Sequence, residues 1–260
     1  MLLRLDRVDE AIENAAMVQT KQDANRIASA SANCGELAAA LDLAFRGLGL
    51  DLVRLDEQPL EYLYDDRSFD GGSNDSEYDF ANWTSDLARQ VGRHDLALEA
   101  KILGFELQPN YGDYLQLQSA SGDTWETLKL RLLKALKTSR YWQIKSARVQ
   151  LYLFEDLLDE SIAVVDKLSS SDASLIQEVM NEVLFERPEW VLNNSKQRAE
   201  PILKAKDAKY YDDEIDWLKY TKKAYEQLDR LGEWVDYRLK LQQIHGRKYK
   251  FINLLKSSGL

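Results

Sequence analysis

Hydrophobic side chains along this chain recur every three or four residues, the spacing of one face of an α-helix. Two segments show the pattern clearly: Trp217, Tyr220, Ala224, Leu228 and Leu231 in one, and Leu128, Leu132, Ala135 and Leu136 in the other. The alternation typical of strands is hard to find, and 4 Pro and 12 Gly in 260 residues favour long helices. The pattern predicts an all-α protein whose apolar stripes pack in its core.

The same pattern predicts where the helices lie. We expect them at about 4–18, 22–32, 36–47, 51–64, 78–91, 94–106, 111–120, 124–137, 140–154, 158–169, 172–186, 188–205, 210–230, 233–244 and 247–257.

A short phrase recurs along these helices: a turn residue, followed five positions later by a small or aliphatic side chain. It follows Gly35, Gly92 and Gly122, and weaker copies follow Asp6 and Asp156. The turn residues are 29, 57, 30 and 34 positions apart. The second step equals two units of about 28, so the spacing is near the roughly 34-residue period of tetratricopeptide (TPR) arrays. The phrase predicts a TPR-like α-solenoid of stacked antiparallel helical hairpins.

We expect one helical-repeat array over residues 1–260. Its predicted parts are first hairpins in 1–64, an acidic Gly/Ser loop insertion at 65–77, central hairpins in 78–190, and mildly basic hairpins with a cap in 191–260. Repeats of this kind bind through the shape of their surface and carry no chemistry of their own. The fold therefore favours protein–protein interaction without catalysis.

Charge is unevenly distributed along the chain. The net charge is −10, with 19 Lys and Arg against 34 Asp and Glu before Val191, and 15 against 10 from there onward. The first part thus carries −15 and the last part +5. Because an acidic body repels phosphate, we expect a protein or peptide partner and no direct binding of nucleic acid. The basic end is suited to an acidic partner or to the acidic body of the chain itself.

The loop at 65–77 has the residue types of a calcium loop. Six of its residues fall at positions 1, 3, 5, 6, 9 and 12 of an EF-hand loop: Asp66, Ser68, Asp70, Gly71, Asn74 and Glu77. Against a calcium site, Ser73 stands at the eighth position, where a bridging apolar residue is usual, and no second copy exists to pair with it. Calcium binding and a flexible acidic insertion both stay open.

Residues that often carry catalysis lack their usual partners here. His94 and His245 each stand beside a Gly and belong to no metal-ligand spacing, so we expect both at helix ends on the surface. The phrase Gly47-Leu48-Gly49 lacks the third Gly of a dinucleotide-binding loop. Cys34 is the single cysteine, and we expect it to pack as a small apolar residue. We therefore predict no catalytic, cofactor or metal site and no enzyme.

The cellular compartment is predicted from the lack of a signal peptide, of a membrane span and of a second cysteine. The N-terminus turns acidic at Asp6, and no stretch approaches the roughly 18 apolar residues of a membrane span. A single cysteine forms no internal disulfide, which suits a reducing environment. We expect a cytoplasmic protein.

The C-terminal stretch 245–255 is the most distinctive basic segment. Phe251, Leu254 and Leu255 share one face of the predicted last helix. That face suits a capping helix that shields the end of an array from water. A docking motif for an acidic partner is the alternative.

This segment, together with the turn phrases, resembles the helical C-terminal region of bacterial SWIM zinc-finger proteins. The matching positions are His245, Arg247, Lys248, Phe251, Leu254 and Leu255, the phrase Gly92-Arg93-His94-Asp95-Leu96-Ala97-Leu98, and Glu106-Leu107-Gln108-Pro109. The resemblance implies a helical accessory arm of a SWIM-type zinc-finger protein associated with nucleic acid. The family's zinc module needs a Cys-x-Cys and a Cys-x-His, which this chain lacks, and Met1 opens directly into a predicted helix. We therefore expect a chain without the N-terminal part of the family.

Three functions stay open at this point. The first is a non-catalytic adaptor that binds a protein or peptide, and the second is the accessory arm that the resemblance implies. The third is a helical enzyme that uses a carboxylate cluster, and it has no motif behind it.

Overall fold

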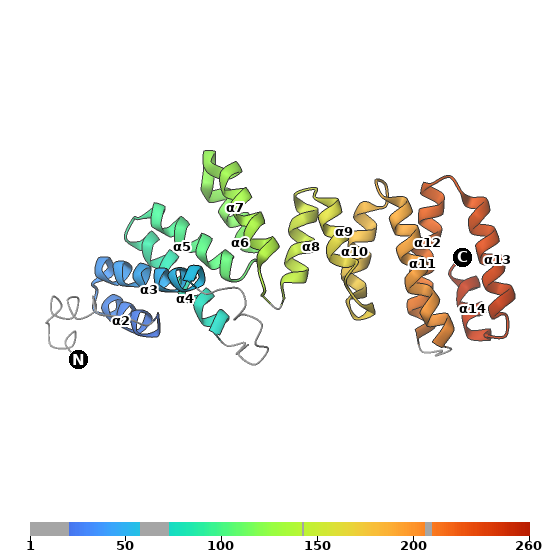
Figure 1. Ribbon diagram of the computed structural model, residues 1–260, viewed down its shortest axis with the longest axis horizontal. Helices are drawn as coiled ribbons and strands as arrows, with labels where there is room; N and C mark the ends of the chain where they lie inside the picture. Colours follow the sequence, from blue (N-terminus) through green and yellow to red (C-terminus); the bar gives the residue numbers. More distant parts are fainter. Residues whose placement is uncertain (1–20, 58–72, 142, 206–209) are drawn as a thin grey trace. The chain divides into compact units, whose positions relative to one another are not determined.

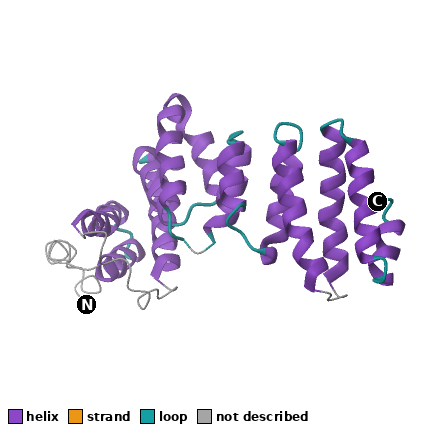
Figure 2. Cartoon of the chain, turned by 45° about the vertical axis from the view of Figure 1, so that its right-hand side comes forward, coloured by secondary structure: helices purple, strands orange, loops and turns teal. Residues whose placement is uncertain are grey.

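The computed structural model describes residues 21–57, 73–141, 143–205 and 210–260, and these are helical with short connections and no strand (Figure 2). The all-α prediction is therefore confirmed. The chain divides between Ala147 and Arg148 into two compact units. The TPR-like arrangement and the single array over 1–260 stay predictions.

Figure 1 shows the helices in their order along the chain. Up to the division they are α2 (Lys21–Asn33), α3 (Leu37–Glu57), α4 (Ser73–Gln90), α5 (His94–Leu107), α6 (Tyr111–Ser121) and α7 (Trp125–Thr138), and α8 (Ile144–Phe154) contains it. The second unit continues with α9 (Leu158–Val165), α10 (Ala173–Val183), α11 (Pro188–Ala205), α12 (Tyr211–Gln227), α13 (Leu231–His245) and α14 (Tyr249–Ser257). Most of the predicted helices agree with these bounds within a few residues, and the predicted helix at 4–18 lies outside the described residues.

Three of the predicted turn residues have the left-handed backbone that ends a helix. The φ angle is 87° at Gly35, 78° at Gly92 and 58° at Asp156. At each, the following amide donates to the carbonyl five residues back, and the turn residue's own amide donates to the carbonyl three back, at 2.8 to 3.1 Å. This pair of hydrogen bonds is the Schellman motif, which satisfies carbonyls that the end of a helix leaves without donors.

The small residue of the repeated phrase is buried because the next helix begins at the turn. Ala40, Ala97 and Ser161, each five positions after a turn residue, have at most 4% of their surface exposed. Each of their amides donates to the carbonyl of the residue just after the turn residue, at 2.9 to 3.1 Å. The phrase thus marks a hairpin, with one residue that ends a helix and one that packs the next helix close to it.

Two turns depart from the prediction. Asp229 has φ 56° and the same pair of hydrogen bonds, so α12 ends before residue 230, where the predicted helix at 210–230 ends. Leu231 of the predicted stripe is instead the exposed first residue of α13. Gly122 has φ 50° but opens a short 3-10 turn, Gly122–Thr124, without the Schellman pair. Asp6 lies outside the described residues.

The predicted break between helices at 47–51 is wrong, because α3 continues through both glycines. A Cβ at Gly47 would lie 2.7 Å from the Cβ of Ala24 and 3.3 Å from Cε1 of Phe80. Those residues belong to α2 and α4, so Gly47 allows three helices to approach closely. Gly49 has nothing within 4 Å of the same position.

The first unit also contains a buried ion pair between α5 and α6. Lys101 Nζ lies 2.5 Å from Asp113 Oδ1, and Asp113 Oδ2 accepts from the Tyr78 hydroxyl and from Asn110 Nδ2, both at 2.9 Å. Asn110 also caps α6, since its Oδ1 accepts from the Asp113 amide at 2.8 Å. Burial and then Asp113 raise the pKa of Tyr78. Every charge in this network has partners, which is the condition for keeping ions inside a core.

The second unit has one continuous apolar core. Its largest fully buried side chains are Ile176, Met180, Leu218, Phe251 and Leu255. Phe251 and Leu255 belong to α14, so the apolar face predicted for the C-terminal helix is buried, while its role as the cap of an array stays a prediction. Ser195 of α11 and Thr221 of α12 are fully buried and hydrogen-bond to each other at 2.9 Å, which fixes these helices side by side.

Two further expectations need correction. The predicted loop at 65–77 ends earlier, because α4 begins at Ser73, and Asn74 and Glu77 are helical; its other part, 65–72, lies outside the described residues. Cys34 is exposed at the turn between α2 and α3, so the expectation that it packs as a small apolar residue is wrong. A residue within the Schellman turn lies beyond the last buried turn of its helix.

The two glycines of α3 provide a matched test of close packing. Gly47→Ala should lower the free energy of unfolding by about 1 to 3 kcal/mol, since the added methyl group overlaps Ala24. Gly49→Ala should be neutral or raise it by about 0.5 to 1 kcal/mol, since alanine is the better helix former. Urea unfolding followed by circular dichroism measures both. Equal effects of the two substitutions would contradict the packing role of Gly47.

Candidate functional site

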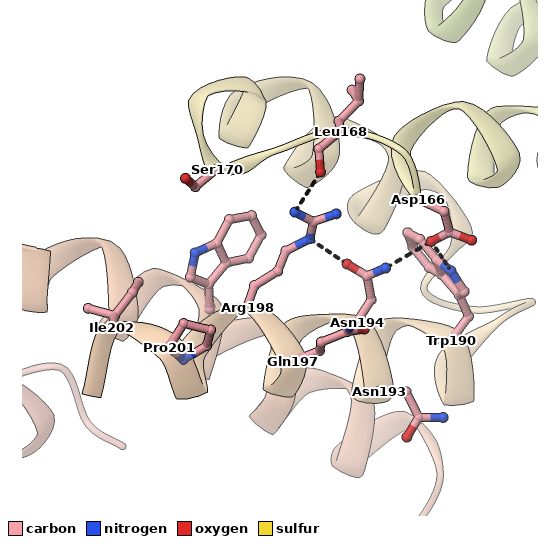
Figure 3. Close-up of a pocket in the computed structure, with 11 residues that line it drawn as sticks. Asp166, Leu168, Ser170, Trp190, Asn193, Asn194, Gln197, Arg198, Pro201 and Ile202 are labelled. Carbon is pink, nitrogen blue, oxygen red and sulfur yellow. Dashed lines mark hydrogen bonds between the residues drawn. The ribbon is translucent and has the colours of Figure 1, made fainter. Parts of the chain in front are cut away.

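An open cavity of about 630 Å³ lies in the second unit, between α11 and the segment that follows α9 (Figure 3). Trp217 of α12 adds to its wall. The lining combines two indoles, four side chains with amide or hydroxyl groups, one carboxylate, one guanidinium and aliphatic surface: Asp166, Leu168, Ser170, Trp190, Asn193, Asn194, Gln197, Arg198, Pro201, Ile202 and Trp217. Mixed walls of this kind, apolar with a few polar groups, are typical of ligand sites.

The position of Arg198 follows from how α9 ends. This helix has no residue with left-handed backbone after Val165. Instead the Arg198 guanidinium donates from Nη2 to the Val165 carbonyl at 3.1 Å and from Nη1 to the Leu168 carbonyl at 3.2 Å. A cation at the C-terminus of a helix also lies at the negative end of the helix dipole. Arg198 therefore anchors the segment after α9 to α11, and its charge is used by the fold.

Arg198 is enclosed on its other sides. Its guanidinium carbon lies 5.8 Å from the centre of the Trp217 ring, a cation–π distance. Burial lowers the pKa of Arg198, and Asp166 opposes that effect in part. An arginine remains charged under such a shift because its ordinary pKa is so high.

A relay of hydrogen bonds runs from Arg198 to the mouth of the cavity. Arg198 Nε donates to Asn194 Oδ1 at 2.6 Å, and Asn194 Nδ2 donates to Asp166 Oδ1 at 2.9 Å. Trp190 Nε1 donates to the same Asp166 oxygen at 3.1 Å. Asp166 is exposed, yet its carboxylate is held in one orientation by two donors (Figure 3). The other oxygen, Oδ2, accepts no hydrogen bond from the described part of the chain.

The spacing along α11 makes the floor of the cavity. Trp190, Asn194, Gln197 and Pro201 stand at i, i+4, i+7 and i+11, which places them in one stripe along a helix. Eleven residues of helix rise about 16 Å. Proline at 201 has no amide hydrogen, so the Gln197 carbonyl lacks the donor that a helix normally supplies four residues later. The stripe thus ends at a backbone acceptor left without that partner.

The sequence contained a signal for this site that the helical pattern concealed. Pro201 lies inside the helix predicted at 188–205, where proline costs helix stability and marks a special position. Neighbouring Asn193 and Asn194 were a second signal. Asp166 was not predictable, since nothing local shows that it meets Trp190 and Asn194 across 24 and 28 residues.

Among the described acids of the second unit, Glu214 has the largest shift in pKa. Its side chain is fully buried in α12, and neither carboxylate oxygen hydrogen-bonds to the described residues. Burial raises its pKa to about 8, with Lys248 opposing the shift. Glu214 is therefore protonated at neutral pH, since a buried charge there would have no hydrogen-bond donor and only the partial compensation of Lys248.

A cluster of aromatic residues faces the same interior. Lys196 donates to the Tyr225 hydroxyl, and its ammonium lies 4.6 Å from the ring centres of both Tyr225 and Tyr237. Burial, followed by the charges of Glu200 and Glu214, raises the pKa of Tyr237 to about 12. The Tyr237 hydroxyl has no partner among the described residues. The aromatic rings already enclose the Lys196 ammonium, so this cluster has no room for a cation from a ligand.

The predicted candidate residues do not gather into one site. His94 begins α5 and is exposed, as expected. His245 ends α13 and packs edge-on against Phe251, and burial followed by Lys248 lowers its pKa. Of the predicted calcium ligands, Asn74 and Glu77 lie in the first turns of α4 and the rest lie outside the described residues, so calcium binding stays a prediction.

The motifs that carry the SWIM resemblance serve turns and packing where they are described. Gly92 forms the turn between α4 and α5, and Glu106 of α5 pairs with Arg131 of α7 at 2.7 Å. No family model matches the chain, and no curated protein sequence is significantly similar to it. The relationship to SWIM proteins therefore stays a prediction. None of the described helices has the length and apolar character required to cross a bilayer.

Glu214 gives the folded state a pH dependence whose sign is set by its raised pKa. Below about pH 4.5 the acid is protonated in both folded and unfolded chains, and its contribution is fully present. Between there and about pH 8 only the folded chain holds the proton, so stability falls by up to about 1.4 kcal/mol per pH unit. We expect Glu214→Gln to remove this slope, which urea unfolding at pH 5, 7 and 9 measures.

Glu226→Gln is the matched control, because Glu226 is exposed on the same helix. It should follow the unchanged protein at every pH. If Glu214→Gln also runs parallel to the unchanged protein, Glu214 does not hold its proton in the folded state.

Proposed function

We propose that this chain is a non-catalytic, TPR-like helical-repeat protein of the cytoplasm that binds a peptide segment of a protein partner in the cavity beside α11. The observation that carries the proposal is the stripe of Trp190, Asn194, Gln197 and Pro201 along an open cavity. Its chemistry is that of binding: indole and aliphatic surface for side chains, and amide groups for a backbone.

The dimensions of the stripe suit an extended peptide. A helical length of about 16 Å equals about five residues of extended chain, at roughly 3.3 Å each. Asn193 and Gln197 stand four residues apart, a rise of about 6 Å, close to the roughly 6.6 Å between alternate residues of an extended chain. Each side-chain amide offers a donor and an acceptor, as does each peptide group.

The polar groups at the rim are available for such a ligand. Asn193, Gln197 and Ser170 are exposed, and their side chains make no hydrogen bond within the described residues. The Gln197 carbonyl adds an acceptor that Pro201 leaves without its helical donor. A peptide amide is the common group that matches both features.

The repeated turns support the helical-repeat part of the proposal. Gly35, Gly92, Asp156 and Asp229 end their helices with the same two hydrogen bonds. A turn geometry that recurs with a buried residue five positions later is what stacked hairpins require. Binding without catalysis is the usual role of such folds.

Photo-cross-linking in the protein's own cells tests the proposal. We expect p-benzoylphenylalanine at Ser170, on the cavity wall, to cross-link a discrete protein partner that the same group at Lys240 on α13 does not reach. Adding Asn193→Ala should reduce the yield about two- to tenfold, the effect of one lost neutral hydrogen bond.

Lys240 is exposed and does not line the cavity, so it controls for random collision. The same products from both positions, or a yield at Ser170 that Asn193→Ala leaves unchanged, would contradict binding in the cavity.

A further inference from the structure

We infer that the cavity selects a peptide with a basic side chain, lysine or arginine, whose cationic group pairs with Asp166 and whose aliphatic stem lies against Trp190. This inference rests on the proposed function and specifies the partner of that same site. The carboxylate is prepared for such a group in three respects: its fixed orientation, its unused oxygen and its lack of a direct ion pair.

The orientation of Asp166 is fixed before any ligand arrives. Trp190 and Asn194 both donate to Oδ1, and Asn194 is itself held by Arg198. An exposed aspartate without such donors would have to lose side-chain freedom on binding. Here that cost is already met by the fold, and Oδ2 is left without a donor from the described residues.

Asp166 makes no direct ion pair with the described cations. Arg198 directs its donors to the Val165 and Leu168 carbonyls and to Asn194. It forms no ion pair with Asp166, and none of the described cations does. Asp166 is the one carboxylate among the lining residues, and Arg198 acts on it at a distance, through Asn194, without a direct ion pair.

Trp190 places apolar surface next to the carboxylate. Its indole is half-buried and donates from the ring edge to the same carboxylate, so a side chain that reaches Oδ2 passes close to the ring. The aliphatic stem of either residue can cover apolar surface while its charged end reaches the carboxylate.

Selection from a library of random nine-residue peptides displayed on phage, with the full chain immobilised, tests the inference. We expect the recovered peptides to share a lysine or arginine and to be lost when Asn193→Ala and Gln197→Ala are combined. The affinity of one recovered peptide is then measured by fluorescence anisotropy. Asp166→Asn should weaken it roughly tenfold or more, the effect of a charge-assisted hydrogen bond.

Two controls isolate the charge of Asp166. Asp166→Asn keeps an oxygen that accepts from Trp190 and Asn194, so the cavity is preserved. Asp236→Asn removes the same charge from an exposed site on α13 that does not line the cavity, and it should leave the affinity unchanged. Replacing the basic residue of the peptide by norleucine should weaken binding to the unchanged protein and not to the Asp166 variant.

The outcomes separate this inference from the proposed function. Peptides that need Asn193 and Gln197 but carry no shared basic residue, or that bind the Asp166 variant equally well, overturn the role of Asp166 and leave the peptide site standing. Recovery of no peptide that depends on Asn193 and Gln197 overturns the peptide site, and this inference with it.

Discussion

Helices in this protein depend on how their C-terminal carbonyls find donors. A helix leaves its last four carbonyls without partners, and a buried carbonyl without a donor costs more than most single contacts contribute. At Gly35, Gly92, Asp156 and Asp229 the solution is local, because left-handed backbone turns amides back onto the helix. The chain then reverses within a few residues, which is how successive helices come to lie against one another.

The end of α9 uses a different solution, and the cavity results from it. The Lys167 and Leu168 amides donate to the Val164 and Val165 carbonyls, and Arg198, 30 residues beyond Leu168 in the chain, adds donors to the Val165 and Leu168 carbonyls. The segment after α9 is therefore tied to α11 by side-chain hydrogen bonds in addition to those of its own amides. An open space remains between segment and helix, with Asp166 and Asn194 on its walls. Stability and the candidate site thus share the same residues.

The two units treat their buried acids in opposite ways. In the first, Lys101 and Asp113 are buried as ions and every neighbour contributes a hydrogen bond. In the second, Glu214 is buried without a hydrogen-bond partner and avoids the cost of a charge by keeping its proton. The first arrangement fixes the positions of α4, α5 and α6, since the ion pair and its hydrogen bonds form only at defined distances and angles. The second links the stability of the folded chain to pH.

The sequence by itself determined the helical class, most helix bounds and three of the left-handed turns, because these depend on periodicity and on glycine or aspartate at single positions. Local patterns did not show that α3 continues through Gly47, since that glycine is required by close contact with Ala24 and Phe80 on other helices. The candidate site was equally out of reach. Asp166 acquires its orientation from Trp190 and Asn194, and these side chains meet only when the segment after α9 folds against α11. Helix and turn preferences depend on neighbouring residues in the sequence. The wall of a binding cavity is formed by residues that meet only after the helices have packed.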